Sequence, residues 1–449
     1  MTRVERRQEG HRAGRRTTTG GTTSPGRTAL LAVLMVALTA AALTLAGTTR
    51  RSIGTTVKTS ERVQLEQRTF TCAGGIPGST AVDGSVDAGL TAPQPVTLAP
   101  KQFDADAKVA LGAFAGQESR SKDWLAWLPC PEPRSRWWFV AAGAATVTHD
   151  TVFTVTNPRD GQADVDINVS GPNGRVAAPG LHGITVAAGQ TRVVDLAKVA
   201  PAVGDLAVSV VATRGLVSVS AADRFAPGVV GKAVQEWLPD QSAPGTSVTL
   251  AGLPAKPDRA TLVVVNPRQV EAIVSVQVIG SGGTFAPKDN ATLTVPPGSV
   301  ANLPVEAVFD GKPLSIRVTS PQFVTAAVRT VSGGDVAFGT AVRPLEGTTA
   351  LAVPAGTGQL VLSSLGAQTS VGVTAFDASG KVLLDQSVAV PKAASVGTAL
   401  PAKTRYVRLV AAHPEAVAGF SVTGPGGVAT AGVEPALRSV LLPVVRPGW

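Results

Sequence analysis

The chain has 449 residues, of which 40 are Lys or Arg and 31 are Asp or Glu, for a formal net charge of +9. Residues 1–28 hold seven arginines and two glutamates and carry +5, whereas the remainder, with 33 basic and 29 acidic residues, carries +4. The basic excess is therefore partly a topogenic signal, and we expect no nucleic-acid partner. Val, Ala, Gly, Thr and Pro are abundant and Lys, Glu and aromatic residues are scarce, which favours strands and turns over helices.

An apolar run without charge extends from Ala29 to Ala46 and continues to Thr49 with small polar residues. A run of this length can just cross the hydrocarbon layer as a helix, and the arginines before it orient the tail inward. We therefore predict a basic cytoplasmic tail over 1–28 and a transmembrane signal-anchor helix over 29–49, inserted in the lipid bilayer. The protein would sit in the cytoplasmic membrane as a single-pass protein, with most of the chain extracytoplasmic.

A cleaved signal peptide is the alternative interpretation of the same run. Its basic start, apolar centre and small residues near Ala46 suit such a peptide, but Arg50 and Arg51 stand where a cleavage site prefers neutral residues. Both interpretations place the body of the chain outside the cytoplasm.

Residues 50–145 form a less regular juxtamembrane region, expected to be a stalk that folds onto the next domain. The chain's two cysteines, Cys72 and Cys130, lie in it. An even pair in an oxidising compartment predicts one disulfide. Closing a loop of about 58 residues would contribute roughly 4 kcal/mol in the chain-entropy model.

Four tryptophans surround Cys130: Trp124, Trp127, Trp137 and Trp138. Exposed indoles on a β-sandwich would allow stacking on sugar rings, so these residues are candidate glycan-stacking positions. However, Trp127-Leu-Pro129 recurs as Trp237-Leu-Pro239, each just ahead of a predicted domain, which favours packing at a seam between domains.

The body contains a repeat of roughly a hundred residues, about the size of one sandwich domain. A strand ending in Asn157-Pro158 recurs ending in Asn266-Pro267, and a more diverged copy follows without this signature. Short strands with turn signals between them predict an all-β fold of tandem immunoglobulin-like or fibronectin-like β-sandwiches after the single N-terminal transmembrane helix. We place the three repeats at 146–243, 244–347 and 348–449.

The exported part resembles a family of actinobacterial membrane-anchored extracytoplasmic proteins of unknown function. The resemblance rests on Cys72, on Cys130-Pro131 followed by Trp137-Trp-Phe-Val-Ala-Ala-Gly143, on Asn157-Pro158, on Gly171-Pro-Asn-Gly174 and on Val186-Ala-Ala-Gly189. It implies an envelope location and a β-sandwich structure. It supplies no catalytic residues.

No spacing of residues typical of a catalytic, cofactor or metal site was found. The histidines of the body are far apart in sequence, and we expect them on the solvated surface: His149, His182 and His413. Asp160, Asp164 and Asp166 would suit a calcium site, but a polar strand face is the preferred interpretation. We therefore expect a protein that is not an enzyme and carries no cofactor or metal.

The predicted function is that of a non-catalytic, membrane-anchored envelope protein that scaffolds or binds other envelope components. Its partner would be an envelope protein or a cell-wall glycan. The alternative is a glycan-binding module that uses the exposed tryptophans. Both are analogies from fold and location, because fold alone does not establish function.

Overall fold

The computed structural model of the chain describes residues 37, 62–64, 67–96, 100–106, 112–145, 148–199, 204–226, 232–289, 291–437 and 439–441. The basic tail over 1–28 and the expected membrane helix over 29–49 lie outside this set, apart from Ala37. Within the described residues, no helix is both long and apolar enough to span a bilayer. The chain divides into two units, Met1–Lys58 and Thr59–Trp449, and the second holds nearly all described residues.

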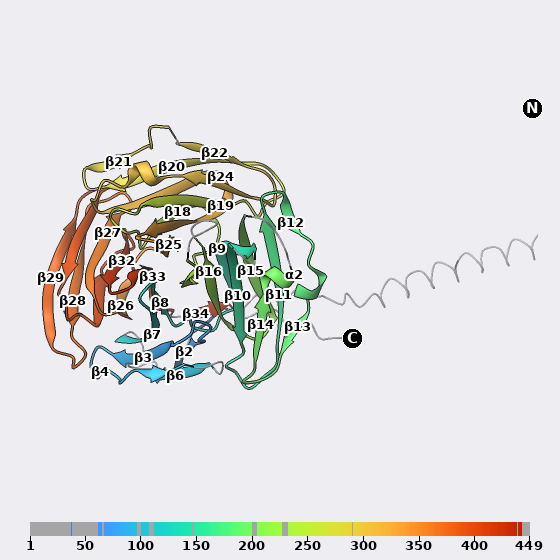
Figure 1. The fold of residues 1–449 in the computed structure, drawn as a ribbon, viewed down its shortest axis with the longest axis horizontal. Helices are drawn as coiled ribbons and strands as arrows, with labels where there is room; N and C mark the ends of the chain where they lie inside the picture. Colours follow the sequence, from blue (N-terminus) through green and yellow to red (C-terminus); the bar gives the residue numbers. More distant parts are fainter. Residues whose placement is uncertain are drawn as a thin grey trace, which may run out of the picture. The chain divides into compact units, whose positions relative to one another are not determined.

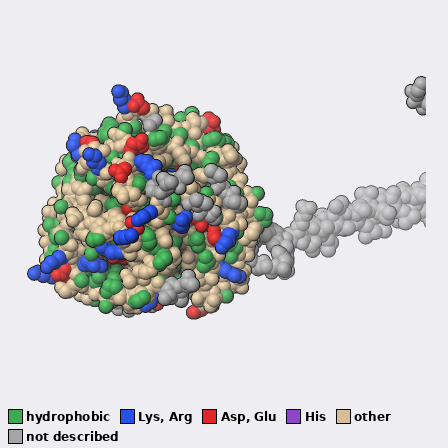
Figure 2. Space-filling model, viewed as in Figure 1, with side chains coloured by type: hydrophobic (Ala, Val, Ile, Leu, Met, Phe, Trp, Pro, Cys, Tyr) green, Lys and Arg blue, Asp and Glu red, His purple; other side chains and the backbone are tan. Residues whose placement is uncertain are grey.

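The described part of the second unit is nearly all β structure, and its sheets are consistent with β-sandwiches. We divide its strands into four modules in chain order, each with an inner and an outer sheet; in modules 2 and 3 strand pairing joins these two into one sheet of nine and of eight strands. Figure 1 shows the modules following one another around a common centre, in blue, green, yellow and orange. On the face in Figure 2, basic and acidic side chains are interspersed.

Module 1 covers residues 67–129, within the region assigned from sequence to the stalk. Its inner sheet has the order β4 (Gly89–Leu90), β3 (Thr80–Ser85), β7 (Ala113–Arg120) and β8 (Leu125–Pro129), and β5 (Gln94–Pro95) also pairs with β3. Its outer sheet pairs β2 (Gln67–Cys72) with β6 (Lys101–Asp106). Phe70, Ala81 and Ala115 belong to its core.

Module 2 covers residues 136–238. In its outer sheet β12 (Gly174–Val176) and β13 (Ile184–Val186) pair with β11 (Ala163–Gly171), followed by β15 (Asp205–Arg214) and β9 (Arg136–Ala145). Its inner sheet has the order β14 (Thr191–Asp195), β10 (His149–Thr156), β16 (Ser218–Phe225) and β17 (Val234–Leu238). Two short helices lie in the connections: η2 (Pro179–Leu181) and α2 (Leu196–Val199). Every second residue of β11 is buried, as expected of a strand with one face on a core.

Module 3 covers residues 245–342. In its outer sheet β21 (Gly283–Phe285) and β22 (Thr292–Val295) pair with β20 (Ala272–Gly280), followed by the first half of β24 (Leu314–Ser332) and β18 (Gly245–Ala251). Its inner sheet has the order β23 (Val300–Pro304), β19 (Arg259–Val265), the second half of β24 and β25 (Asp335–Val342). The short helix η3 (Glu306–Val308) follows β23. Strand β24 therefore serves both sheets.

Module 4 covers residues 347–433. Its outer sheet has the order β26 (Gly347–Ala352), β31 (Tyr406–Ala411), β28 (Thr369–Phe376) and β29 (Val382–Val390). Its inner sheet has the order β30 (Ser395–Leu400), β27 (Thr357–Ser364), β32 (Ala416–Gly424) and β33 (Gly427–Val433). Val373 of the outer sheet and Leu360 and Phe420 of the inner sheet share one core.

The Asn-Pro signature of modules 2 and 3 performs the same structural role twice. The Nδ2 of Asn157 donates to the carbonyls of Gly161 and Val186, and its Oδ1 accepts from the amide of Arg159. Asn266 makes the corresponding bonds in module 3, to Val270, Val295 and Arg268. Both asparagines are buried, so each satisfies the backbone where a strand leaves the inner sheet.

In all four inner sheets the second strand along the chain lies beside the first, and the last strand forms the opposite edge. These last strands, β8, β17, β25 and β33, are called the central strands here, and they contact one another in a closed circle. A further pair closes the unit between its chain ends, because β1 (Arg62–Gln64) pairs antiparallel with β34 (Ser439–Leu441). The central strands therefore bring together residues from all four modules.

Candidate functional site

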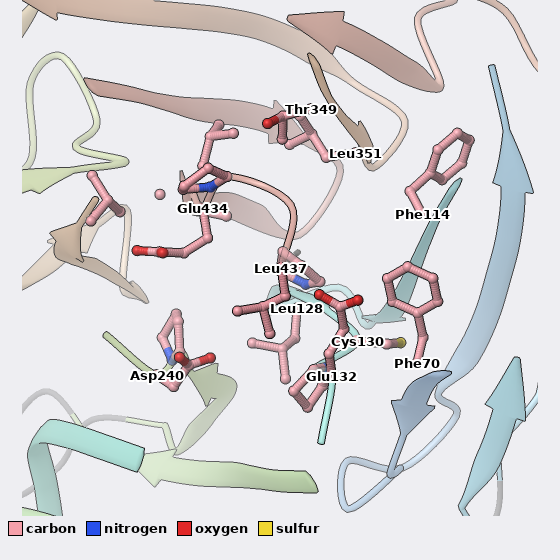
Figure 3. Close-up of a pocket in the computed structure, with 18 of the residues that line it drawn as sticks. Phe70, Phe114, Leu128, Cys130, Glu132, Asp240, Thr349, Leu351, Glu434 and Leu437 are labelled. Carbon is pink, nitrogen blue, oxygen red and sulfur yellow. The ribbon is translucent and has the colours of Figure 1, made fainter. Parts of the chain in front are cut away.

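A cavity of about 130 Å³ lies where the four central strands end. Each of these strands leads into a short segment that combines proline with a charged residue: Pro131-Glu132 after β8, Pro239-Asp240 after β17, Arg343-Pro344 after β25 and Glu434-Pro435 after β33. Because proline cannot extend a strand ladder, each of these four segments leaves its sheet at the same level. Each segment thereby places its charged residue near the centre. In Figure 3 the carboxylates of Asp240 and Glu434 lie opposite Phe70 and Phe114.

The disulfide belongs to the wall of this cavity. Cys72 and Cys130 are bonded, which confirms the prediction from the sequence, and Cys130 lines the cavity. The bridge joins the end of β2 to the segment that follows β8. It therefore fixes module 1 at the point where the chain passes to module 2.

Three arginine–carboxylate pairs surround the cavity. Arg68 Nε lies 2.5 Å from Glu132 Oε1, and Arg343 Nε lies 2.7 Å from Glu434 Oε2. The third pair is formed by Arg134 and Asp240. Positive and negative charges balance, and the pairs of Arg134 and Arg343 each join segments that follow different modules.

Arg134 is the most constrained of these cations. Its guanidinium lies 3.8 Å from the centroid of the Trp137 ring, and its backbone pairs with Val217. Burial lowers the pKa of Arg134 to about 10, while Glu434 acts in the opposite direction. Because this pKa lies well above 7, Arg134 remains a cation at neutral pH and can pair with the carboxylate of Asp240.

Two polar atoms at the cavity have no hydrogen-bond partner among the described residues. One is the hydroxyl of Thr349, a residue only 4 % exposed, and the other is Nε of Arg134. Buried polar groups normally find a partner or an ordered water. The cavity therefore has the polarity and size to hold water or a small polar group.

The opposite ends of the central strands carry carboxylates instead of ion pairs. Asp335 is buried, and its Oδ2 accepts the amides of Leu125 and Val428, from modules 1 and 4. Its Oδ1 accepts its neighbour's amide, that of Val336. Burial raises the pKa of Asp335 to about 7, although these hydrogen bonds oppose the shift.

Glu236 lies near Asp335 in the same central region. Its Oε1 accepts the backbone amides of Trp127 and Trp237, and its Oε2 has no partner. Burial, and next the charge of Asp335, raise the pKa of Glu236 well above its usual range. Trp127 and Trp237 occupy the same place in the repeated Trp-Leu-Pro motif. Their backbone amides therefore donate to the same carboxylate.

The tryptophan cluster is not uniformly exposed. Trp127 and Trp137 are each 1 % exposed, which corrects the idea that sugars stack on them, because neither ring face is accessible. Trp124 and Trp138 are half-buried and pack against the core of module 2. Burial of the first two follows from their positions, on a central strand and on the inward face of β9.

The expectation of solvated histidines is wrong for His149, although His182 and His413 are exposed. His149 is 7 % exposed, its Nε2 lies 3.0 Å from Asp223, and its Nδ1 lies 3.7 Å from Asp205. Asp205 also pairs with Arg329 of module 3 and accepts from Asn302, 2.7 Å away. The sequence offered no sign of this network, since its members are spread between residues 149 and 329 and come from two modules.

Two of the three candidate calcium ligands, Asp164 and Asp166, are engaged elsewhere. Asp164 accepts from Gln162 and Thr185, and Asp166 accepts the amide of Gly183. Throughout the described ranges, no group of three or more His, Cys, Asp or Glu is arranged to hold a metal ion.

The fold and the site define a multi-module β protein whose modules are tied at a common centre. Residues 105–401 match the model of DUF5719, a family of unknown function. Because the match covers more than half of the chain, the protein belongs to this family. No curated protein matches the sequence.

Proposed function

We propose that the protein is a non-catalytic, membrane-anchored extracytoplasmic component of the cell envelope that binds or scaffolds other envelope components. The charge-free run Ala29–Ala46 between two groups of arginines supports the anchor and its orientation. The disulfide between Cys72 and Cys130 supports an oxidising compartment for the body.

The observation that supports a binding role is that the ionisable groups at the centre bond to other parts of the protein. The arginines of the cavity pair with carboxylates, and Asp335 and Glu236 accept backbone amides from different modules. These groups hold the modules together instead of meeting a reactant. A rigid framework of this kind presents its outer sheets and edges to partners.

Location and binding can be tested separately in cells that make the protein. For location, one variant carries Thr18→Cys in the tail and another carries Lys403→Cys at an exposed turn of module 4. A membrane-impermeant maleimide applied to intact cells should label only the second variant. Labelling of the tail alone would contradict the orientation.

For binding, photo-crosslinking from exposed outer-sheet positions should recover a recurring envelope protein. The matched control places the crosslinker at buried Phe153, which should recover nothing. Crosslinking to lipid alone would contradict a scaffolding role.

A cell-wall glycan is the second candidate partner, and Trp124 and Trp138 support it because their indoles are half-buried. Trp138→Ala should weaken retention of purified cell-wall polymer without a comparable fall in thermal stability. Trp137→Ala is the control, since it should destabilise the fold. Full retention by both variants would end this alternative.

A further inference from the structure

The outer sheets of modules 2, 3 and 4 end in equivalent edge strands that differ in length. In module 2 this edge is split into β12 and β13, of three residues each, and in module 3 into β21 and β22, of three and four residues. In module 4 it is the single strand β29, of nine residues. Short and interrupted edges are a usual protection against pairing with other chains, and module 4 lacks it.

Among the strands that the structure describes, β29 pairs only with β28, on one side. In Figure 1 it forms the outer rim of module 4, at the left of the view. Its exposed residues include Val382, at 50 %, and Gln386, Ser387 and Ala389. The strand contains neither Pro nor Gly, and after a register irregularity between Val382 and Leu384 it would offer about 20 Å of regular unpaired backbone.

The charges at this edge are distributed unevenly. Lys381 and Lys392 are exposed just beyond either end of β29, and neither takes part in a salt bridge within the described residues. The one charge within the strand, Asp385, accepts a hydrogen bond of 2.9 Å from Thr374 of β28. The free edge therefore presents a cation at each end.

This arrangement disfavours a second copy of the chain as the occupant. Antiparallel pairing of two β29 strands about the point between Gln386 and Ser387 would place Lys381 of each copy opposite Lys392 of the other. Like charges in neighbouring cross-strand positions are destabilising. An incoming strand with carboxylates at its two ends would instead complement both lysines.

We propose that β29 is a strand-addition site that binds an extended segment of another protein, with acidic residues flanking both ends of the segment. Main-chain hydrogen bonds supply affinity in such complexes, and flanking charges supply selectivity. The inference rests on the proposed binding role and specifies the chemistry of its partner.

The test uses the full chain in detergent and two synthetic peptides. Both contain three Thr-Val pairs, flanked by two glutamates at each end in one peptide and by two lysines in the other. Titration by isothermal calorimetry should show binding of the glutamate peptide and at least about tenfold weaker binding of the lysine peptide. The difference should shrink as salt is raised.

A charge exchange then assigns the site. The double variant Lys381→Glu and Lys392→Glu lies outside the strand and should reverse the preference between the peptides. Lys403→Glu, at an exposed turn of the same module, is the matched control and should change neither affinity. Far-UV circular dichroism checks that each variant is folded.

Failure of both peptides to bind, or a preference unchanged by the exchange, would overturn the proposal. A dimer that the glutamate peptide cannot displace would also overturn it, in favour of a second copy. None of these results depends on where the protein resides, so the cellular experiments above can succeed or fail independently.

Discussion

The two ends of the central strands are held together by different chemistry. Where the strands end, arginine–carboxylate pairs and a disulfide surround a small cavity. Where β25 and β33 begin, Asp335 accepts backbone amides from modules 1 and 4, and no salt bridge to it is formed by the described residues. At the cavity end, ion pairs hold the modules together. At the opposite end, the modules are held by the carboxyl group of Asp335, which is easier to bury when it is protonated.

This difference predicts a pH dependence of stability at the end that Asp335 occupies. Asp335 favours protonation in the folded state, so its contribution weakens as pH rises. Substitutions at each end therefore separate the two contributions.

The largest expected effect comes from the disulfide at the cavity end. Replacing Cys72 and Cys130 together with Ala should lower the free energy of unfolding by about 4 kcal/mol, because the unfolded chain regains the freedom of that loop. Urea denaturation of the variant and of the parent under oxidising conditions measures the loss. Equal stabilities would show that the bridge adds nothing to the cavity wall.

At the opposite end, Asp335 should make stability depend on pH. Its folded-state pKa of about 7 lies above the ordinary value of 3.8, so the folded protein binds this proton more tightly than the unfolded chain. This contribution is complete below pH 3.8, falls as pH rises toward 7, and is constant above that. One pKa unit corresponds to about 1.4 kcal/mol, so the fall is at most roughly 4 kcal/mol.

Asp335→Asn removes the titration but keeps one acceptor oxygen. Denaturation between pH 4 and pH 8 should show a flatter curve for this variant than for the parent. Parallel curves would mean that Asp335 is ionised in the folded state at all these pH values.

A smaller effect is expected for Arg134→Leu at the cavity end. The substitution leaves the largely buried Asp240 without its cation and should cost about 2 kcal/mol. The double variant with Asp240→Leu should recover part of the loss, since it leaves no unpaired charge. A double-mutant cycle without coupling energy would show that the Arg134–Asp240 pair does not stabilise the cavity end.

The smallest effect tests the unpartnered hydroxyl in the cavity wall. Thr349→Val should leave stability within about 0.5 kcal/mol of the parent or raise it slightly. Thr330→Val, whose hydroxyl donates to the carbonyl of Ala337 on β25, should cost about 1 kcal/mol. Equal losses would indicate that Thr349 has a partner.

The local features of this fold could be predicted from the sequence because they depend on short stretches of chain. Alternation of apolar residues indicated strands, the Asn-Pro turns marked modules 2 and 3, and the count of cysteines indicated the disulfide. The sheets of module 1 were not foreseen, because its strands are short and irregularly spaced. The predicted boundary after residue 145 also separates β9 from module 2, to which this strand belongs.

The central region could not be predicted, because it joins segments about a hundred residues apart. Nothing adjacent to Asp335 in sequence indicates that it accepts amides from Leu125 and Val428. Likewise, His149 lies close to Asp205 of its own module, and Asp205 pairs with Arg329 of module 3. Contacts between modules leave no periodic pattern in a single sequence.

Hydrogen exchange of the full chain in detergent, followed by mass spectrometry, tests most directly whether the central strands unite the modules. If these strands tie the modules together, peptides covering β8, β17, β25 and β33 should exchange last and at a common rate, because opening one requires opening all. Four separate rates, each matching the rest of its own module, would contradict it.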